Sequence, residues 1–224
     1  MKNVRYSGPL QQHNSTIIEL GSPFVVPWII AADAIRVAGF GGAQKALEFG
    51  CGEGHASIEL LSRTEIDLDL LDINPKMISV ARRRLRRFKA RTTFITQDVH
   101  TFLSMHANYS VMFSSFVLHN FPRVERPGLL IECRKAMQRD GLFILDDCIP
   151  PDRGDKACYA RQIERYQCLP FDIRDPLIRH VEQDATPEYR MPEHQILEDL
   201  EKAGFKSIEV LDRIEREALI VARA

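Results

Sequence analysis

Short apolar runs alternate with stretches of helical periodicity from residue 40 onward. Five of the runs have the length and residue types of buried strands, and they lie at residues 45–50, 66–73, 92–96, 109–114 and 142–145. Strands that alternate with amphipathic helices are typical of βαβ units around a largely parallel sheet. The hydrophobic pattern therefore predicts a fold of the α/β class.

The rhythm changes after the fifth run. A helix over residues 125–137 and the turn signal Arg139-Asp140-Gly141 lead into that run. Residues 150–191 then contain several prolines and helix-prone polar segments, such as residues 155–167, without a strand pattern. We interpret residues 150–191 as a helical cap inserted after strand 5, where it would cover the active site.

The two ends of the chain complete the pattern. A helix is predicted from Pro27 to Ala38, within an N-terminal helical segment over residues 1–40 that would close over the site from the other side. A helix over residues 193–203 is followed by two strands at residues 206–211 and 218–222. A short charged turn separates these strands, so we expect them to form an antiparallel hairpin.

The composition fits a single domain over residues 1–224. Hydrophobic residues make up 45% of the chain and charged residues 27%, a balance typical of globular proteins. The longest apolar stretch, residues 24–32, is interrupted by proline and is shorter than the ~20 residues of a membrane span. No apolar run follows the basic start, so we expect no secretory signal, a cytoplasmic location and no membrane partner.

Cysteine usage and charge narrow the function further. The five cysteines are odd in number and lack CxxC spacing, which argues against a disulfide framework and a structural zinc site. We therefore expect free thiols and no metal. A net charge of -1 gives the whole molecule no electrostatic attraction to nucleic acid.

The strongest chemical signal is the segment Glu48-Phe49-Gly50-Cys51-Gly52-Glu53-Gly54, where the first strand turns into the first helix. Its glycines let the backbone approach a ligand closely, and amides at the helix start offer hydrogen-bond donors. A dinucleotide site would have the fingerprint G-x-G-x-x-G, whereas this segment is E-x-G-x-G-x-G. The leading carboxylate suits a cationic amino group better than a phosphate, which favours S-adenosylmethionine.

Two further acids end the second and third strands. Asp72 is placed to accept hydrogen bonds from ribose hydroxyls, and Asp98 could hold the adenine amino group. Val99 lies beside Asp98, and Ile73 and Met77 are apolar neighbours that could cover the adenine ring. Each acid could instead serve only as a turn or helix-capping residue.

These residues resemble the class I S-adenosylmethionine-dependent methyltransferase family, in which the glycine loop and the two strand-end acids bind the cofactor. The likeness runs from about residue 40 to the end of the chain. It includes Ser114-Ser115-Phe116-Val117-Leu118-His119-Asn120 after strand four, Asp140-Gly141 before strand five and Ala203-Gly204-Phe205 before strand six. The resemblance implies a Rossmann-like seven-stranded mixed sheet of order 3-2-1-4-5-7-6, flanked by helices. The cofactor-binding residues that we predict are Glu48, Phe49, Gly50, Cys51, Gly52, Asp72, Ile73, Met77, Asp98, Val99, Ser114 and Ser115.

Three residues near the expected position of the methyl group are candidates for catalysis. His119 follows strand four and could remove a proton from the acceptor, or it could merely cap a helix. Asp146 and Asp147 end strand five; we expect one to orient or deprotonate the acceptor and the other to be a solvated or capping residue. Many methyl transfers need only alignment of the reactants, so the role of His119 stays open.

Basic residues between positions 82 and 91 form the one marked charge cluster of the sequence. They could contact RNA phosphates. However, Met77, Ala81, Leu85 and Phe88 recur at helical spacing and predict a buried stripe, which makes the arginines the exposed face of that helix. The basic residues are Arg82, Arg83, Arg84, Arg86, Arg87, Lys89 and Arg91.

The sequence thus predicts an enzyme that moves a methyl group from S-adenosylmethionine to an oxygen, nitrogen or carbon of a small molecule by in-line displacement. Three alternatives stay open: an RNA (tRNA)-modifying methyltransferase, an enzyme like the carboxy-S-adenosylmethionine synthases, and a non-catalytic S-adenosylmethionine-binding partner subunit. The cap region is faintly similar to that of the synthases, although their glycine loop differs. The sequence leaves the oligomeric state open, and a homodimer is compatible with it.

Overall fold

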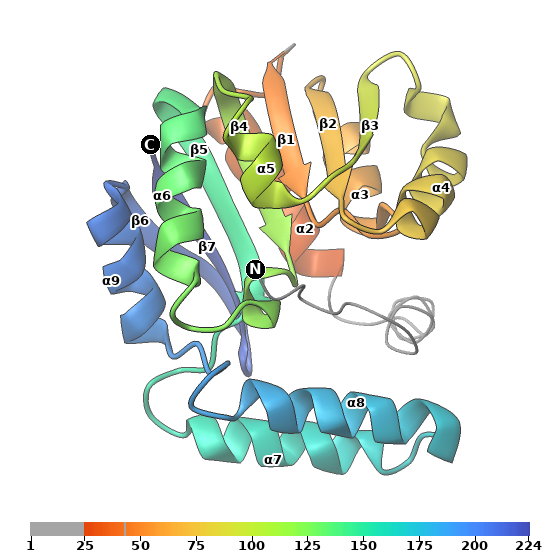
Figure 1. The fold of residues 1–224 in the computed structure, drawn as a ribbon, viewed down its shortest axis with the longest axis vertical. Coiled ribbons are helices and arrows are strands. Elements are labelled where there is room, and N and C mark those ends of the chain that lie inside the picture. Colours follow the sequence, from red (N-terminus) through yellow and green to blue (C-terminus); the bar gives the residue numbers. More distant parts are fainter. Residues whose placement is uncertain (1–24, 43) are drawn as a thin grey trace.

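The computed structural model describes residues 25–42 and 44–224, and seven strands in them form one mixed sheet of order β3-β2-β1-β4-β5-β7-β6 (Figure 1). Strand β7 runs antiparallel to both of its neighbours, β5 and β6. The predicted strand order and the Rossmann-like α/β class are therefore confirmed. The strands are β1 (Lys45–Phe49), β2 (Asp67–Asp72), β3 (Thr92–Thr96), β4 (Tyr109–Ser115), β5 (Met137–Cys148), β6 (Lys206–Ile214) and β7 (Glu217–Arg223).

Helices cover both faces of the sheet (Figure 1). One face is covered by α2, α3 and α4, and the other by α5, α6 and α9. The helices are α2 (Val25–Val37), α3 (His55–Arg63), α4 (Pro75–Arg84), α5 (Val99–Leu103), α6 (Arg126–Ala136), α7 (Asp155–Tyr166), α8 (Phe171–Asp184) and α9 (Glu193–Ala203). Two 3₁₀ turns are η1 (Arg86–Phe88) and η2 (Leu118–Asn120).

Strand β1 shows how the sequence fills both layers. Side chains alternate between the two faces of a strand. Leu47 and Phe49 therefore join the core under α5, α6 and α9, whereas Ala46 joins the core under α2, α3 and α4. Because both faces of a parallel sheet are covered, its central strands are apolar almost throughout. This packing fixes the carboxyl end of β1, where the glycine segment begins.

Local capping signals place the helix ends close to their predicted positions. The Asn74 side chain accepts a hydrogen bond from the Lys76 amide (2.9 Å), and Pro75 occupies the first position of α4. Asp98 accepts a bond from the Thr101 amide (3.0 Å) and caps α5. Gly204 ends α9 with a φ of 95°, a conformation in which glycine has no steric penalty.

The predicted cap consists of α7 and α8, which lie side by side beyond the end of β5 (Figure 1). The Tyr159 hydroxyl of α7 donates to the carbonyl of Asp184 in α8 (3.2 Å) and links the two helices. Arg216, in the hairpin between β6 and β7, pairs with Asp184 (2.7 Å) and also donates to Gln162 of α7. The cap is therefore docked on the terminal hairpin as well as on β5.

One prediction needs adjustment, and a second one is tested only in part. The turn expected at Arg139-Asp140-Gly141 is an irregular stretch within β5, because pairing with β4 begins at Met137 and resumes at Leu142 after a register shift. Asp140 has a φ of 61° there, so the turn residues make a bulge instead of separating the helix from the strand. Helix α2 confirms the predicted N-terminal helix, and residues 1–24 of the segment predicted over 1–40 lie outside the described residues.

Candidate functional site

The glycine segment turns sharply over the end of β2. Gly50, Gly52 and Gly54 have φ values of 70°, 52° and 79°, in the left-handed region that favours glycine. The amides of Gly50 and Cys51 both donate to the carbonyl of Leu71, at 2.7 and 3.0 Å. The turn is thus held against β2, beside the acid that ends that strand.

The first two glycines have different surroundings. A Cβ atom on Gly50 would lie 2.3 Å from Cγ2 of Val117, so this position is closed by a neighbouring loop. A Cβ atom on Gly52 would meet no atom of the described residues within 4 Å. Gly50 is therefore required by packing, whereas Gly52 faces open space that a ligand can approach.

Glu48 lies buried at the end of β1, with 2% of its surface exposed. The Ser57 hydroxyl donates to its Oε2 at 2.6 Å. Burial raises the pKa of Glu48 to about 8, against the opposing effect of the Ser57 hydrogen bond, and the nearby charge of Asp72 adds to the rise. Because burial disfavours the charged form of Glu48, a cationic partner would stabilise its carboxylate.

Asp72 is shared between the glycine turn and the start of α4. Its Oδ2 accepts a hydrogen bond from the Gly52 amide (2.9 Å), and its Oδ1 accepts one from the Asn74 amide (2.8 Å). Burial raises the pKa of Asp72, although both hydrogen bonds oppose the rise. Each carboxylate oxygen has a second lone pair, so Asp72 can still accept from a ribose hydroxyl.

The residues predicted around the adenine lie at the adjacent strand end. Asp98 follows β3, the strand that pairs with β2 up to Thr96 and Asp72. Asp98 caps α5 through its Oδ1 atom, so its second carboxylate oxygen, Oδ2, takes no part in the capping hydrogen bond. Ile73 is 55% exposed, and Met77 and Val99 are half-buried. These three apolar side chains therefore have surface to offer to a ring.

The other predicted cofactor residues are more enclosed. Phe49 has no exposed surface and packs in the core, so only its backbone can face a ligand. Cys51 is 6% exposed, and Ser114 is fully buried. Among the described residues, the Ser114 hydroxyl has no hydrogen-bond partner. Ser115 donates to Asp146 (2.8 Å) and accepts from the Trp28 indole (2.9 Å).

Asp146 is tied to the N-terminal helix. Its Oδ2 accepts hydrogen bonds from the Trp28 indole (3.0 Å) and from Ser115, while its Oδ1 has no partner among the described residues. Burial raises the pKa of Asp146 to about 7. The sequence analysis did not identify Trp28, although it is the one tryptophan of the chain and lies in the predicted N-terminal helix.

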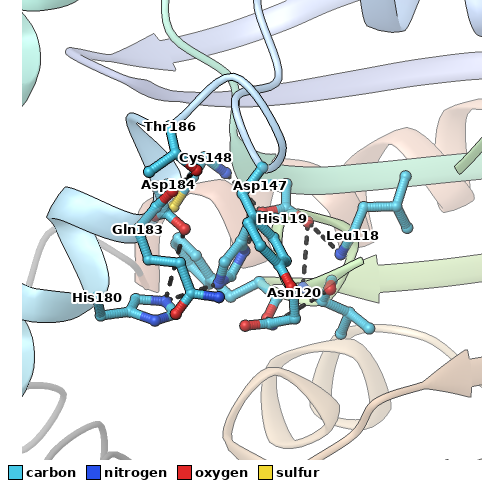
Figure 2. A network of polar contacts seen from close by, with 12 residues as sticks. Leu118, His119, Asn120, Asp147, Cys148, His180, Gln183, Asp184 and Thr186 are labelled. Carbon is cyan, nitrogen blue, oxygen red and sulfur yellow. Dashed lines mark hydrogen bonds and ion pairs between the residues drawn. The ribbon is translucent and has the colours of Figure 1, made fainter. Parts of the chain in front are cut away.

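Asp147 and His119 form a buried ion pair on the other side of the strand end (Figure 2). The His119 Nδ1 lies 2.5 Å from Asp147, which also accepts hydrogen bonds from the amides of Val117, Leu118 and Cys148. Burial raises the pKa of Asp147, but the charge and hydrogen bond of His119 outweigh it and hold that pKa below its usual value. Both strand-five acids are fully buried, so neither of them is solvated. Of the two roles predicted for the second acid, Asp147 has the capping one, because it accepts hydrogen bonds from the amides at the start of η2.

The second ring nitrogen of His119 faces the cap. Its Nε2 lies 3.0 Å from the Nε2 of His180 in α8. Burial lowers the pKa of His119, but the charges of Asp147 and Asp184 outweigh burial, so the pKa of His119 is raised overall. The pKa of His180 is lowered to about 4 by burial and by the nearby charge of His119. His119 is 4% exposed, so it links the sheet to the cap instead of standing free at the mouth of the site.

Comparison with known proteins finds similar methyltransferases. Residues 46–141 match the model of a family described as a methyltransferase domain. A demethylmenaquinone methyltransferase of Thermotoga maritima is 28% identical over 111 residues, which are 49% of this chain and 45% of the relative. A carboxy-S-adenosyl-L-methionine synthase of Nautilia profundicola is 26% identical over 192 residues, or 80% of this chain and 76% of the relative. Residues 46–141 of this chain therefore match a methyltransferase domain, in agreement with the resemblance noted in the sequence.

Solved structures agree with this fold. A putative O-methyltransferase from Nostoc punctiforme superposes with a TM-score of 0.65 at 17% identity, over 88% of this chain and 56% of that chain. A structure titled PigF with SAH gives a TM-score of 0.60 at 17% identity, over 81% and 50% of the two chains. The present chain thus spans about half the length of the first curated relative and of these structures. S-adenosylmethionine is the cofactor of the family.

The basic residues between positions 82 and 91 fall into two groups. Arg84 pairs with Glu53 of the glycine segment (3.2 Å), and Arg91 donates to the carbonyls of Thr64 and Leu61. Other members, such as Arg83, are exposed, while the predicted apolar stripe is buried at Ala81 and Leu85 and half-buried at Met77 and Phe88. Part of the cluster is therefore structural, and the rest is the solvent face of α4 and η1.

The expectations about cysteines and membranes can be compared with the structure. All five cysteines are free, as predicted. Among the residues that the structure describes, no helix combines the length and apolar character that a membrane crossing requires.

The two glycines at the turn give a testable contrast. We expect Gly50→Ala to lower the free energy of unfolding by about 2–4 kcal/mol, because the new methyl group clashes with Val117 and the backbone is left-handed. Gly52→Ala is expected to cost only about 1–2 kcal/mol but to weaken S-adenosylmethionine binding, because its methyl group enters the open space. Urea denaturation and calorimetric titration measure the two effects. Wild-type cofactor affinity in Gly52→Ala would contradict this assignment of the open space.

Proposed function

We propose that this chain transfers the methyl group of S-adenosylmethionine to an oxygen, nitrogen or carbon of a small-molecule acceptor. The observation that carries the proposal is the convergence at one edge of the sheet of a left-handed glycine turn, a buried carboxylate at Glu48 and a second carboxylate at Asp72. Ligands of open α/β sheets bind at this carboxyl edge, next to the point where the strand order reverses. Here that point lies between β1 and β4.

The residues of the turn fit S-adenosylmethionine in charge and shape. Glu48 is a buried carboxylate that a cationic amino group would stabilise, and Asp72 has lone pairs for the ribose hydroxyls. The open space at Gly52 admits the ligand close to the backbone. When bound, the cofactor supplies an electrophilic methyl group on a sulfonium. The chain aligns the acceptor with that methyl group and excludes water.

Two residues are the proposed proton acceptors, and a third orients one of them. Asp146 is held by Trp28 and Ser115 and has a carboxylate oxygen, Oδ1, without a partner among the described residues, so it is ready to accept a hydrogen bond. His119, oriented by Asp147, could accept a proton at Nε2 only after its contact with His180 opens. The geometry therefore favours Asp146 as the residue that contacts the acceptor. The role of Asp147 is to orient His119.

The helices around the carboxyl edge would enclose the acceptor. Helix α2 reaches this edge through Trp28, and the cap over residues 150–191 reaches it through His180. Trp28 contacts Ser115 and Asp146 near the ends of β4 and β5, and His180 contacts His119 in η2, which follows β4. We propose that these two elements form the walls of the acceptor site within a single domain.

Calorimetric titration with S-adenosylmethionine, S-adenosylhomocysteine and NAD tests the cofactor assignment. We expect saturable binding of the first two and none of NAD. Binding of NAD alone would overturn the proposal. A methyl-transfer screen with isotope-labelled cofactor against metabolites and bulk tRNA then identifies the acceptor class. Cofactor binding without any turnover would favour the non-catalytic partner subunit.

The carboxy-S-adenosyl-L-methionine synthase activity is a second candidate, because that relative aligns over 80% of this chain. Mass spectrometry of the nucleoside after incubation with a metabolite extract separates the two activities. A methyltransferase converts the cofactor to S-adenosylhomocysteine, whereas a synthase of this kind yields the carboxylated sulfonium.

The RNA-modifying alternative depends on the exposed arginines of α4 and η1. If RNA were the acceptor, Arg83→Glu combined with Arg87→Glu would abolish salt-sensitive RNA binding without affecting cofactor binding. We expect no such RNA binding, because several members of the cluster serve contacts within the chain.

A further inference from the structure

Three potential metal ligands, His119, Cys148 and Asp184, converge where the cap meets the sheet, and a fourth, His180, lies beside two of them (Figure 2). His119 comes from η2, Cys148 ends β5, and His180 and Asp184 belong to α8. We propose that these four side chains bind one divalent transition-metal ion of the zinc type, which fastens the cap to the sheet. The number and spacing of the cysteines predicted no metal, and that pattern takes no account of ligands that are distant in sequence.

The distances between the donor atoms support the site. The donor atoms of His119, Cys148 and Asp184 all lie within 4.8 Å of one another. The Nε2 atoms of His119 and His180 are 3.0 Å apart, and the Nε2 of His180 lies 4.0 Å from Oδ1 of Asp184. Donors bonded to a tetrahedral zinc at its usual bond lengths of about 2.0–2.3 Å lie roughly 3.3–3.8 Å from each other. Small side-chain movements therefore suffice to close the site around an ion.

Neighbouring residues already orient two of the ligands. Asp147 holds Nδ1 of His119 at 2.5 Å, which directs Nε2 toward the other donors. A carboxylate that holds the far nitrogen of a histidine is the usual support of a metal-binding imidazole. Arg216 in turn holds Oδ2 of Asp184 at 2.7 Å, while Oδ1 points to His180. The ligands are thus positioned by contacts that metal binding would leave intact.

The donor set selects the kind of metal. Two imidazoles, one thiolate and one carboxylate suit zinc and cobalt, whereas magnesium and calcium prefer sites made of oxygen. Binding displaces the proton shared between the two histidines and releases the proton of the Cys148 thiol, so the ion exchanges for protons without any redox step.

The site would control how the cap is held. His180 and Asp184 are four residues apart and share one face of α8. One ion bound to them, to η2 and to the end of β5 would join three elements that are distant in sequence. We expect the metal to slow the opening of the cap, and with it access to the proposed acceptor site.

Metal analysis of the purified chain and titration with cobalt test the inference. We expect one equivalent of zinc by mass spectrometry, and one equivalent of cobalt that produces a thiolate-to-cobalt charge-transfer absorption. Cys148→Ser should remove that absorption. His180→Asn should weaken cobalt binding by about 100-fold or more. A loss of this size exceeds the one expected if His180 only held a metal ligand in place without binding the ion itself. His180 is partly exposed, so this variant is expected to fold.

Matched controls are available on the same chain. His194 pairs with Asp152 (2.6 Å) at an exposed position, and Cys168 is the exposed cysteine. His194→Asn and Cys168→Ser should leave stoichiometry and absorption unchanged. The wild-type chain gives a second readout, because proteolysis within the cap should slow about 100-fold when free zinc is 100 times its Kd. Absence of stoichiometric binding, or binding that survives both Cys148→Ser and His180→Asn, would overturn the proposal.

Discussion

Arg126→Met is expected to lower the free energy of unfolding by about 3 kcal/mol or more, since each buried acceptor left without a donor costs about 1–3 kcal/mol. Arg126 is 1% exposed at the start of α6. Its guanidinium donates to the carbonyls of Leu118 (3.2 Å), Phe121 (3.0 Å) and Arg190 (3.0 Å), and also to that of Tyr189. The variant removes every one of these bonds while keeping the apolar stem of the side chain. Urea denaturation followed by circular dichroism measures the loss.

Arg134→Met is the matched control for this variant. Arg134 lies on the same helix and donates to a single carbonyl, that of Gly204, at 3.3 Å near the surface. Its replacement should change the free energy of unfolding by less than about 0.5 kcal/mol. Equal losses in the two variants would mean that the buried guanidinium is not what joins η2 to the segment that follows α8.

Glu48→Gln is expected to have two opposite effects, a weaker affinity for S-adenosylmethionine and a more stable ligand-free protein at high pH. A hydrogen bond between charged groups contributes about 1.5–3 kcal/mol, so loss of the carboxylate should weaken cofactor binding by about 10- to 100-fold. Calorimetric titration at pH 8 measures this loss. The residue is replaced by one of nearly equal shape, which leaves the packing of β1 unchanged.

The pH dependence of stability follows from the pKa of Glu48. Burial raises that pKa from 4.5 to about 8, so the folded state favours the protonated carboxyl. The resulting stability is fully present below pH 4.5 and is lost as the pH rises through about 8. The shift corresponds to on the order of 5 kcal/mol, which Glu48→Gln should restore at pH 9. Denaturation of both proteins at pH 5, 7 and 9 measures the difference.

Glu59→Gln provides the control for the Glu48 variant. Glu59 lies on α3 and pairs with Arg63 (3.1 Å) in a partly exposed contact. We expect little change in stability or in cofactor affinity from its replacement, because exposed pairs contribute at most about 1 kcal/mol. If Glu48→Gln kept the wild-type dependence of stability on pH, Glu48 would not be the buried acid that we describe.

Much of the fold could be predicted, because the strands and helices are indicated by residues that are neighbours in the sequence. Apolar runs gave strands within a few residues of their observed bounds, and β3 matches its prediction at both ends. Helix α9 also matches, since Gly204 ends it with the backbone conformation that glycine tolerates. The bulge at Asp140 was missed, because only its pairing with β4 distinguishes a bulge from a turn. Strand β6 is longer than predicted for the same reason, since its last residues pair with β7.

The sequence by itself determined the α/β class, the glycine turn and the acids that follow the first three strands, since each depends on a few neighbouring residues. The tertiary structure alone decided which side chains meet across the chain. Trp28 meets Asp146 over 118 positions, and His119 meets His180 over 61. These contacts form only when α2 and the cap dock on the sheet, and docking depends on the packing of the whole core, which periodicity along the chain does not encode.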